Sequence, residues 1–278
     1  MKVALTAIVK NENRYLKEWV EYYKQLGIDH IYIGDNNDSN EEQLEEVLYD
    51  YLELPNPYVT IINIKNRIAY QSTYYLYIYN EYGYKYDWMC FFDVDEFLTL
   101  KYDNTIQDYL SRDIFYGVDQ IHINWLTYDD NDLIEYDDRP VQERFTRISN
   151  IYDKETNTSH QTMLKYGCKS IIKSGLNICS HIHTFINLND KELITVDGNG
   201  ESSYQMWGSC DAINRYNLAY LKHYATKSLN EYLYKKYNKI DCTHTYTYSF
   251  DYYFIINDHT VEKDKYINNY LNLMSLYN

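Results

Sequence analysis

The chain has 278 residues, of which 45% are hydrophobic, and its formal net charge is -15. This length and hydrophobic content predict a single globular unit with a sizeable core. The acidic balance argues against nucleic acid as a partner and against membrane docking through basic clusters, because both depend on Lys and Arg. An anionic partner would therefore need a metal ion or a local basic pocket.

The cysteines and the N-terminal segment indicate the cellular compartment of the protein. Five cysteines occur without a C-x-x-C pair, which is typical of reduced thiols in a cytosolic protein. The apolar start MKVALTAIV is too short for a secretory signal, and no segment reaches the length of a membrane span. We expect a cytoplasmic protein without a transmembrane segment, and peripheral contact with the inner face of a membrane stays open.

Strand and helix patterns alternate through the first hundred residues. Apolar, β-rich runs predict strands at 2–9, 28–34, 58–64 and 87–92. Apolar residues at helical spacing predict helices at 16–26, 44–51 and 69–82. This alternation predicts an α/β fold with a parallel sheet covered by helices on both faces, in which ligands bind beyond the carboxyl ends of the strands.

The pattern is less regular after residue 100. Strands are predicted at 119–125, 168–174 and 180–186, with an acidic loop at 128–140. Residues 215–238 are predicted to be helical, and so is a tail at 261–278 that would pack on the same domain.

Two acids follow the apolar run WMCFF at the end of the fourth predicted strand. Side chains two residues apart in an extended segment point the same way, so Asp93 and Asp95 can converge on one cation, while Val94 and Glu96 face away. Mg²⁺ and Mn²⁺ commonly bind one or two carboxylates together with substrate phosphates. The pair therefore predicts a metal site suited to a nucleoside-diphosphate donor, and a solvated acidic cap on the strand is the alternative.

Other charged residues are predicted to lie on the solvent-exposed surface. A second D-x-D pattern, Asp130 and Asp132, falls in the acidic loop and predicts solvated carboxylates. Lys169 and Lys173 are interpreted as a solvated face of the strand at 168–174.

Several ordered motifs run through residues 3–235. The segments VKNENRYLKEWVEYYKQLGIDHIYIGDN and NRIAYQSTYYLYIYNEYGYKYDWMCFFDVDEFL are followed by ERF at 143–145, KSIIKS at 169–174, histidines at 181–183 and LKHYATKSLNEYLYKK. On these motifs the chain resembles glycosyltransferase family 92 and neighbouring bacterial family 2-like transferases. Their pattern is an NE-x-x-Y-x-x-EW helix, a D-N loop, an R-x-x-x-Q helix and a D-x-D-E-F strand end.

The resemblance implies a fold of the glycosyltransferase A (GT-A) type, with a mostly parallel central sheet flanked by helices and a helical C-terminal extension. Residues 1–240 would form the transferase domain. Within it, 1–100 would be the nucleotide-sugar-binding half and 101–240 the acceptor-side half. Residues 241–278 would be an extension that packs on the same domain.

The resemblance also implies transfer of a hexosyl group, with galactose the first candidate, from a UDP-sugar to a glycan or glycoconjugate acceptor. Inversion at the anomeric carbon and a place in polysaccharide biosynthesis are expected. By position, Asp93, Asp95 and His223 would hold Mn²⁺ or Mg²⁺. The residues that would bind the donor are Ala7, Val9, Asn11, Glu12, Asp35, Asn36, Arg67, Gln71, Asp93, Val94 and Lys227.

Several of these residues also have structural interpretations. Asn11 and Glu12 are typical helix-capping residues, and His223, predicted on a helix, is also typical of a core histidine. The loop WLTYDDNDLIEYDD replaces a Gly/Ser-rich loop of the family, and Lys222 replaces the Asn before the late His. The identity of the acceptor therefore does not carry over.

An inverting transfer needs a carboxylate that deprotonates the acceptor hydroxyl. Asp211, in WGSCDAINRY, is the first candidate, and Glu143, Asp129 and Asp130 are alternatives.

Two other functions stay open from the residues alone. A metal-dependent phosphohydrolase or nucleotidyltransferase also places acids at strand ends. A non-catalytic glycan-binding module would use some of the 36 tyrosines as stacking platforms.

Overall fold

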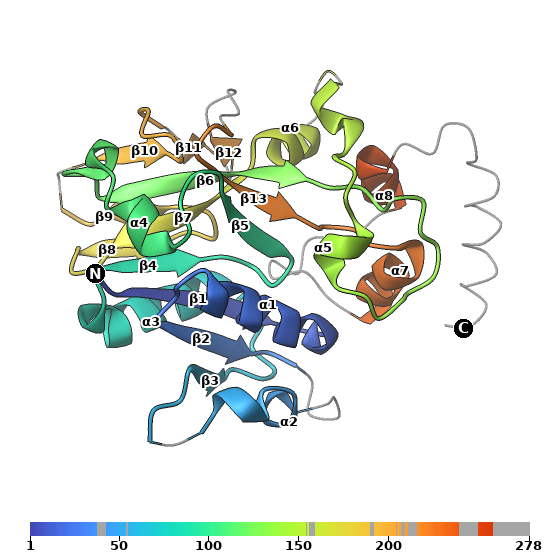
Figure 1. Ribbon diagram of the computed structural model, residues 1–278, viewed down its shortest axis with the longest axis horizontal. Coiled ribbons are helices and arrows are strands. Elements are labelled where there is room, and N and C mark those ends of the chain that lie inside the picture. The colour runs from blue at the N-terminus through green and yellow to red at the C-terminus, as the bar shows by residue number, and fades with distance from the viewer. Residues whose placement is uncertain are drawn as a thin grey trace.

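The computed structural model describes residues 1–37, 43–53, 55–153, 155, 159–189, 192–203, 205–206, 209–210, 216–238 and 250–257. These residues build a nine-stranded mixed sheet with helices on both faces (Figure 1). Within the described part of the chain, none of the helices combines the length and the apolar character that crossing a bilayer requires.

The central sheet has the strand order β3-β2-β1-β4-β7-β6-β13-β5, and β10 pairs with β6 beside this path. Its strands are β1 (Val3–Val9), β2 (His30–Asp35), β3 (Val59–Asn63), β4 (Trp88–Phe91), β5 (Glu96–Leu100), β6 (Gln120–Thr127), β7 (Cys168–Lys173), β10 (Thr195–Asp197) and β13 (Ala219–His223). Two small hairpins are β8 (Ile178–Ser180) with β9 (Phe185–Asn187), and β11 (Gln205–Met206) with β12 (Ser209–Cys210). Strands β3, β2, β1 and β4 run parallel, whereas β7 is antiparallel to both of its neighbours.

The connecting segments contain α-helices and short 3₁₀ turns. The α-helices are α1 (Asn13–Gln25), α2 (Leu44–Val47), α3 (Gln71–Tyr82), α4 (Ile106–Leu110), α5 (Val141–Arg144), α6 (Ser159–Tyr166), α7 (Leu229–Asn238) and α8 (Phe250–Ile256). The 3₁₀ turns are η1 (Tyr49–Tyr51), η2 (Gly83–Lys85), η3 (Asp113–Phe115) and η4 (Asn150–Asp153). The four strands and three helices predicted in the first hundred residues are confirmed, although the second helix is only one turn followed by η1.

The first strand shows how the sheet separates two apolar layers. Successive side chains of a strand point to opposite faces, so Leu5 packs in the cluster that contains Trp19 of α1, while Ala4 packs in the cluster that contains Tyr74 of α3. Helix α1 buries a stripe at helical spacing: Leu16, Trp19, Val20 and Tyr23. Burial of these faces explains why β1, α1 and α3 sit where the periodicity predicts. The predicted α/β architecture is therefore confirmed.

The predicted helix at 215–238 is wrong in its first half. Residues Ala219–His223 form strand β13, whose alternate side chains Ala219, Leu221 and His223 are buried. Alternate burial is the pattern of a strand with one buried face, and β13 pairs with β6 and β5 at its two edges. The helix starts only at Leu229. The tail at 261–278 and most of the predicted extension lie outside the described residues.

Three helices that follow residue 128 lie together at one end of the sheet. Figure 1 shows α5, α7 and α8 grouped beyond the end of β13. A buried ion pair joins two of them, because both terminal nitrogens of the Arg144 guanidinium donate to the Glu231 carboxylate, at 2.7 and 3.0 Å. Tyr15 of α1 donates to the same carboxylate at 2.7 Å. These contacts fix α7 against α1 and α5, next to the acidic turn after β4.

Candidate active site

The acids after β4 lie in a tight turn rather than in an extended segment. Strand β4 ends at Phe91, β5 begins at Glu96, and the two aspartates lie in the link between them. The Asp93 N–H donates to Glu96 Oε2 at 2.8 Å, and the Glu96 N–H donates to the Asp93 carbonyl at 3.1 Å. The Trp19 indole N–H contacts the carbonyls of both residues at 3.1 Å. The extended segment on which the same-side alignment of Asp93 and Asp95 was predicted is therefore a turn.

Asp93 is held by protein groups on both of its oxygens. Oδ1 accepts hydrogen bonds from Gln71 Nε2 at 2.9 Å and from the Tyr75 hydroxyl at 3.2 Å. Oδ2 lies 2.7 Å from the ammonium of Lys169. Burial alone would raise the pKa of Asp93, but the positive charge of Lys169 outweighs it and lowers the pKa below its usual range.

Lys169 is the buried cation of this network. Its side chain is 0% exposed, whereas that of Asp93 is 33% exposed. Lys169 was predicted to lie on a solvated face, and that prediction is wrong. Strand β7 lies inside the sheet between β4 and β6, and its first five residues, Lys169 among them, are all buried.

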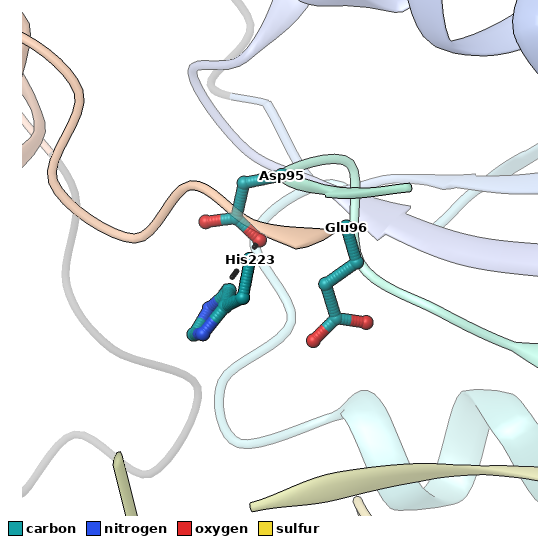
Figure 2. Close-up of side chains that lie close together, drawn as sticks. All are labelled: Asp95, Glu96 and His223. Carbon is teal, nitrogen blue, oxygen red and sulfur yellow. Dashed lines mark ion pairs between the residues drawn. The ribbon is translucent and has the colours of Figure 1, made fainter. Parts of the chain in front are cut away.

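Three potential metal ligands lie close together beside Asp93. One ligand atom from each of Asp95, Glu96 and His223 lies within 4.8 Å of the other two, and all three residues are buried. Figure 2 shows the three side chains, which come from the turn, the start of β5 and the end of β13. His223 is the direct cross-strand partner of Glu96 in the antiparallel β5–β13 pair. Sheet pairing therefore builds this cluster from residues 127 positions apart in sequence.

Burial disfavours the charged forms of both His223 and Glu96. Burial lowers the pKa of His223 to about 4, so its imidazole is neutral at pH 7 and keeps a lone pair for a metal. Burial raises the pKa of Glu96 well above its usual range. Glu96 Oε1 and His223 Nδ1 have no hydrogen-bond partner among the described residues. A buried carboxylate oxygen without a partner is costly, and a bound divalent cation would satisfy it.

Two further lysines face this cluster. The Lys235 ammonium on α7 lies 3.0 Å from Asp95 Oδ2 and 3.7 Å from Glu12 Oε1. Lys227 is buried in the loop before α7, with a left-handed φ of 57° and its ammonium 4.4 Å from the centre of the Tyr15 ring. Burial lowers the pKa of Lys227, and the nearby charges of Asp95 and Glu12 oppose that shift. The structure thus places Lys227, a predicted donor-binding residue, beside the metal-ligand candidates.

The predicted donor-binding residues of the first two strands meet at one edge of the sheet. The Asn36 N–H donates to the Val9 carbonyl at 2.9 Å, and the Asn36 side chain donates to the Arg67 carbonyl at 3.1 Å. Asn11 has a left-handed φ of 55°, which turns the chain sharply after β1. Ala7, Val9, Glu12 and Asp35 are buried around them. This edge is formed by the carboxyl ends of parallel strands, where α/β proteins bind ligands.

The predicted catalytic bases that the structure describes differ in their surroundings. Asp211 lies outside the described residues, and Glu143 is exposed on α5. Asp130 is 0% exposed, and it accepts a hydrogen bond from the Tyr253 hydroxyl of α8. The prediction that Asp130 is solvated is therefore wrong, and its placement gives no support to a role as base. Asp129 binds Arg147 and is also buried.

Sequence reasoning missed Glu96, Lys169 and Lys235 as site residues. Strict strand alternation pointed Glu96 away from the aspartates, but a turn breaks that alternation. Lys235 is in the quoted motif LKHYATKSLNEYLYKK, four residues after Glu231 and therefore on the same face of a helix. That spacing is the signal that could have linked Lys235 to the site.

Comparison with known families identifies the class of protein. Residues 5–206 match the model of glycosyltransferase family 92. The chain belongs to glycosyltransferase family 92. The motifs predicted this family, and the matched range includes the acidic turn and the strands β2 to β7.

The curated relatives support the same family over a shorter stretch. A family 92 protein of Oryza sativa subsp. japonica is 28% identical over 120 residues, which are 39% of this chain and 18% of that protein. A family 92 protein of Ricinus communis is 27% identical over 112 residues, or 38% of this chain and 19% of that protein. The match thus spans less than a fifth of the length of either relative.

Two solved structures align with parts of the fold. S. aureus TarS aligns at a TM-score of 0.31 and 8% identity, covering 46% of this chain and 22% of TarS. The galactosyltransferase LgtC, in complex with donor and acceptor sugar analogs, aligns at a TM-score of 0.29 and 12% identity, covering 43% of this chain and 46% of LgtC.

Proposed function

We propose that this family 92 glycosyltransferase depends on a divalent metal and transfers a hexosyl group from a UDP-sugar to a glycan or glycoconjugate acceptor. The observation that carries the proposal is the buried cluster of Asp95, Glu96 and His223, in which a carboxylate oxygen and an imidazole nitrogen lack partners. Family membership favours this function over a phosphohydrolase, a nucleotidyltransferase and a non-catalytic glycan-binding module.

Asp95, Glu96 and His223 would hold Mn²⁺ or Mg²⁺. Such an ion stabilises the negative charge that develops on a diphosphate leaving group. Metal binding by Asp93 stays a prediction from sequence, because both of its oxygens have protein partners. In our proposal, Glu96 replaces Asp93 as a ligand. Asp93, held by Lys169, then fixes the turn that carries the other two acids.

The nucleoside would bind at the carboxyl ends of β1 and β2. Asn36 Oδ1 is buried without a hydrogen-bond partner among the described residues, so it can accept a hydrogen bond from a base or ribose. Asn11, Glu12 and Asp35 surround this position, and Gln71 lies on the side of Asp93. The diphosphate would then extend toward the three-ligand cluster and the buried ammonium of Lys227.

The finer details of the reaction rest on the family resemblance alone. Galactose is the first candidate for the transferred sugar, and inversion is the expected stereochemistry. Asp211 and Glu143 stay candidates for the base that deprotonates the acceptor.

A binding screen tests the donor and the metal together. We expect UDP-hexoses to raise the unfolding temperature of the protein only when Mn²⁺ or Mg²⁺ is present, because a ligand of the native state stabilises it by mass action. Asp95→Asn should abolish the metal-dependent shift, whereas the exposed control Glu46→Gln should keep it. Equal shifts for Asp95→Asn and the unmodified protein would contradict the proposed site. A nucleotide shift without metal would contradict metal dependence.

A further inference from the structure

Lys235 contacts the candidate metal ligand Asp95 directly. Its ammonium lies 3.0 Å from Asp95 Oδ2, while Asp95 Oδ1 faces His223 Nε2 at 4.0 Å. The two oxygens of one carboxylate thus face two different cation positions. Oδ2 contacts the Lys235 ammonium, and Oδ1 lies on the side of the three-ligand cluster shown in Figure 2.

A divalent ion in the cluster would share Asp95 with the ammonium. Like charges at such short separations repel, and the buried surroundings screen the repulsion less than bulk water does. Lys235 should therefore weaken the binding of a metal ion by itself. The same ammonium would gain a partner when a nucleoside diphosphate brings phosphate oxygens to the metal.

Lys235 is the lysine of this site that is best placed to exchange partners. Lys169 is 0% exposed and is held 2.7 Å from Asp93. Lys227 is buried in a loop with a left-handed φ and lies against the Tyr15 ring. The Lys235 side chain is 13% exposed, and its ammonium is joined to helix α7 by a flexible four-carbon side chain.

We propose that Lys235 is an exchangeable counterion of the active site. In the free protein it pairs with Asp95 and Glu12, and on donor binding its ammonium transfers to the diphosphate. Lys235 therefore opposes metal binding alone and supports metal-dependent diphosphate binding. This inference rests on the proposed metal-dependent use of a nucleoside diphosphate and adds a residue outside the family match at 5–206.

The test measures two affinities for each variant by calorimetry. The first is Mn²⁺ alone, and the second is UDP at saturating Mn²⁺. We expect Lys235→Met to bind Mn²⁺ several-fold more tightly and UDP about tenfold more weakly, the scale of one hydrogen bond to a charged group. Lys235→Arg keeps the charge and should restore most of the UDP affinity. Lys85→Met, an exposed lysine of η2 remote from the turn, should change neither value.

The inference requires that Lys235→Met change the Mn²⁺ affinity and the UDP affinity in opposite directions. Weaker binding of both Mn²⁺ and UDP by Lys235→Met would show that Lys235 only positions Asp95, and unchanged binding of both would show no role, so either result overturns the inference. The unfolding temperature of each variant is measured alongside, and Lys235→Gln, which also removes the charge, carries the test if Lys235→Met does not fold. An unmodified protein that binds no UDP with Mn²⁺ would instead contradict the proposed function itself.

Discussion

His223 lies directly opposite Glu96 in the antiparallel pair of β13 and β5. Both side chains are buried, and the ring of Trp125 packs 4.2 Å from the imidazole, which limits its rotation. The backbone supports the same contact, because the Tyr224 N–H donates to the Asp95 carbonyl at 2.9 Å. A neutral imidazole is thus fixed beside two acids before any ligand binds.

The first prediction concerns the imidazole. His223→Ala should weaken Mn²⁺ binding by more than about tenfold, since loss of a ligand costs more than loss of an outer-shell partner. Titration calorimetry with Mn²⁺ measures the change. His181, which is exposed in the link between β8 and β9, offers a matched control, and His181→Ala should bind Mn²⁺ as the unmodified protein does. Equal losses in both variants would argue against ligation by His223.

A second prediction compares the two partners of the Asp93–Lys169 pair. Removing the Asp93 carboxylate leaves the Lys169 ammonium, which is 0% exposed, without its ion-pair partner. Removing Lys169 instead leaves a carboxylate that is 33% exposed. Asp93→Asn should therefore lower the free energy of unfolding by about 3 kcal/mol, and Lys169→Met by less. Urea unfolding measures both values.

The double variant checks that these costs come from one interaction. Asp93→Asn combined with Lys169→Met should lose clearly less stability than the two single losses added together. Additive losses would mean that the two side chains do not stabilise each other.

A third prediction uses the buried pair of Arg144 and Glu231. Burial alone would raise the pKa of Glu231, but the hydrogen bonds and charge of Arg144 outweigh it and lower the pKa below its ordinary value of 4.5. The pair therefore contributes stability that is fully present above about pH 4.5 and is lost as the pH falls through the lowered folded-state pKa. Glu231→Gln should lower the free energy of unfolding at pH 7 by about 3 kcal/mol.

The same variant should lose less additional stability on acidification than the unmodified protein. Unfolding by urea at pH 7 and at pH 3.5 measures this difference. Glu21→Gln, which breaks the exposed pair with Lys24, serves as the control and should change stability little. A steeper acid loss in Glu231→Gln than in the unmodified protein would contradict this account of the pair.

A fourth prediction concerns helix α8. The Asn257 side chain, next to the end of α8, accepts a hydrogen bond from the Asp130 N–H at 2.8 Å and donates to Thr226 Oγ1 at 3.2 Å. Asn257→Leu should leave a buried N–H without a partner and cost about 2 kcal/mol of unfolding free energy. Thermal unfolding measures this cost, and Asn187→Leu, on the small β8–β9 hairpin, should cost less because its side chain is only half-buried.

The elements of the first hundred residues could be predicted because their signals are local. Helix α1 repeats apolar residues at helical spacing, and β1 and β2 are short apolar runs between polar turns. His223 was placed on a helix because its neighbours also fit a helical pattern. Pairing with β5 and β6 decides its conformation instead, and that pairing is a long-range contact that no sequence window contains.

The metal-ligand candidates were predicted only in part for the same reason. The position of Asp95 at the end of an apolar strand was visible, and the resemblance pointed to His223. The role of Glu96 depends on a turn that reverses the chain between β4 and β5, and the burial of Lys169 depends on strand order. Sequence spacing alone specifies neither feature.

Mn²⁺ binding by Glu96→Gln tests the central claim most directly, because the substitution keeps the size of the side chain and removes its ability to form a carboxylate. The account predicts that the unmodified protein and Glu46→Gln bind one Mn²⁺ with the same affinity in a calorimetric titration, and that Glu96→Gln binds it at least about tenfold more weakly. Binding by Glu96→Gln with the affinity of the unmodified protein would contradict a metal site made by Asp95, Glu96 and His223.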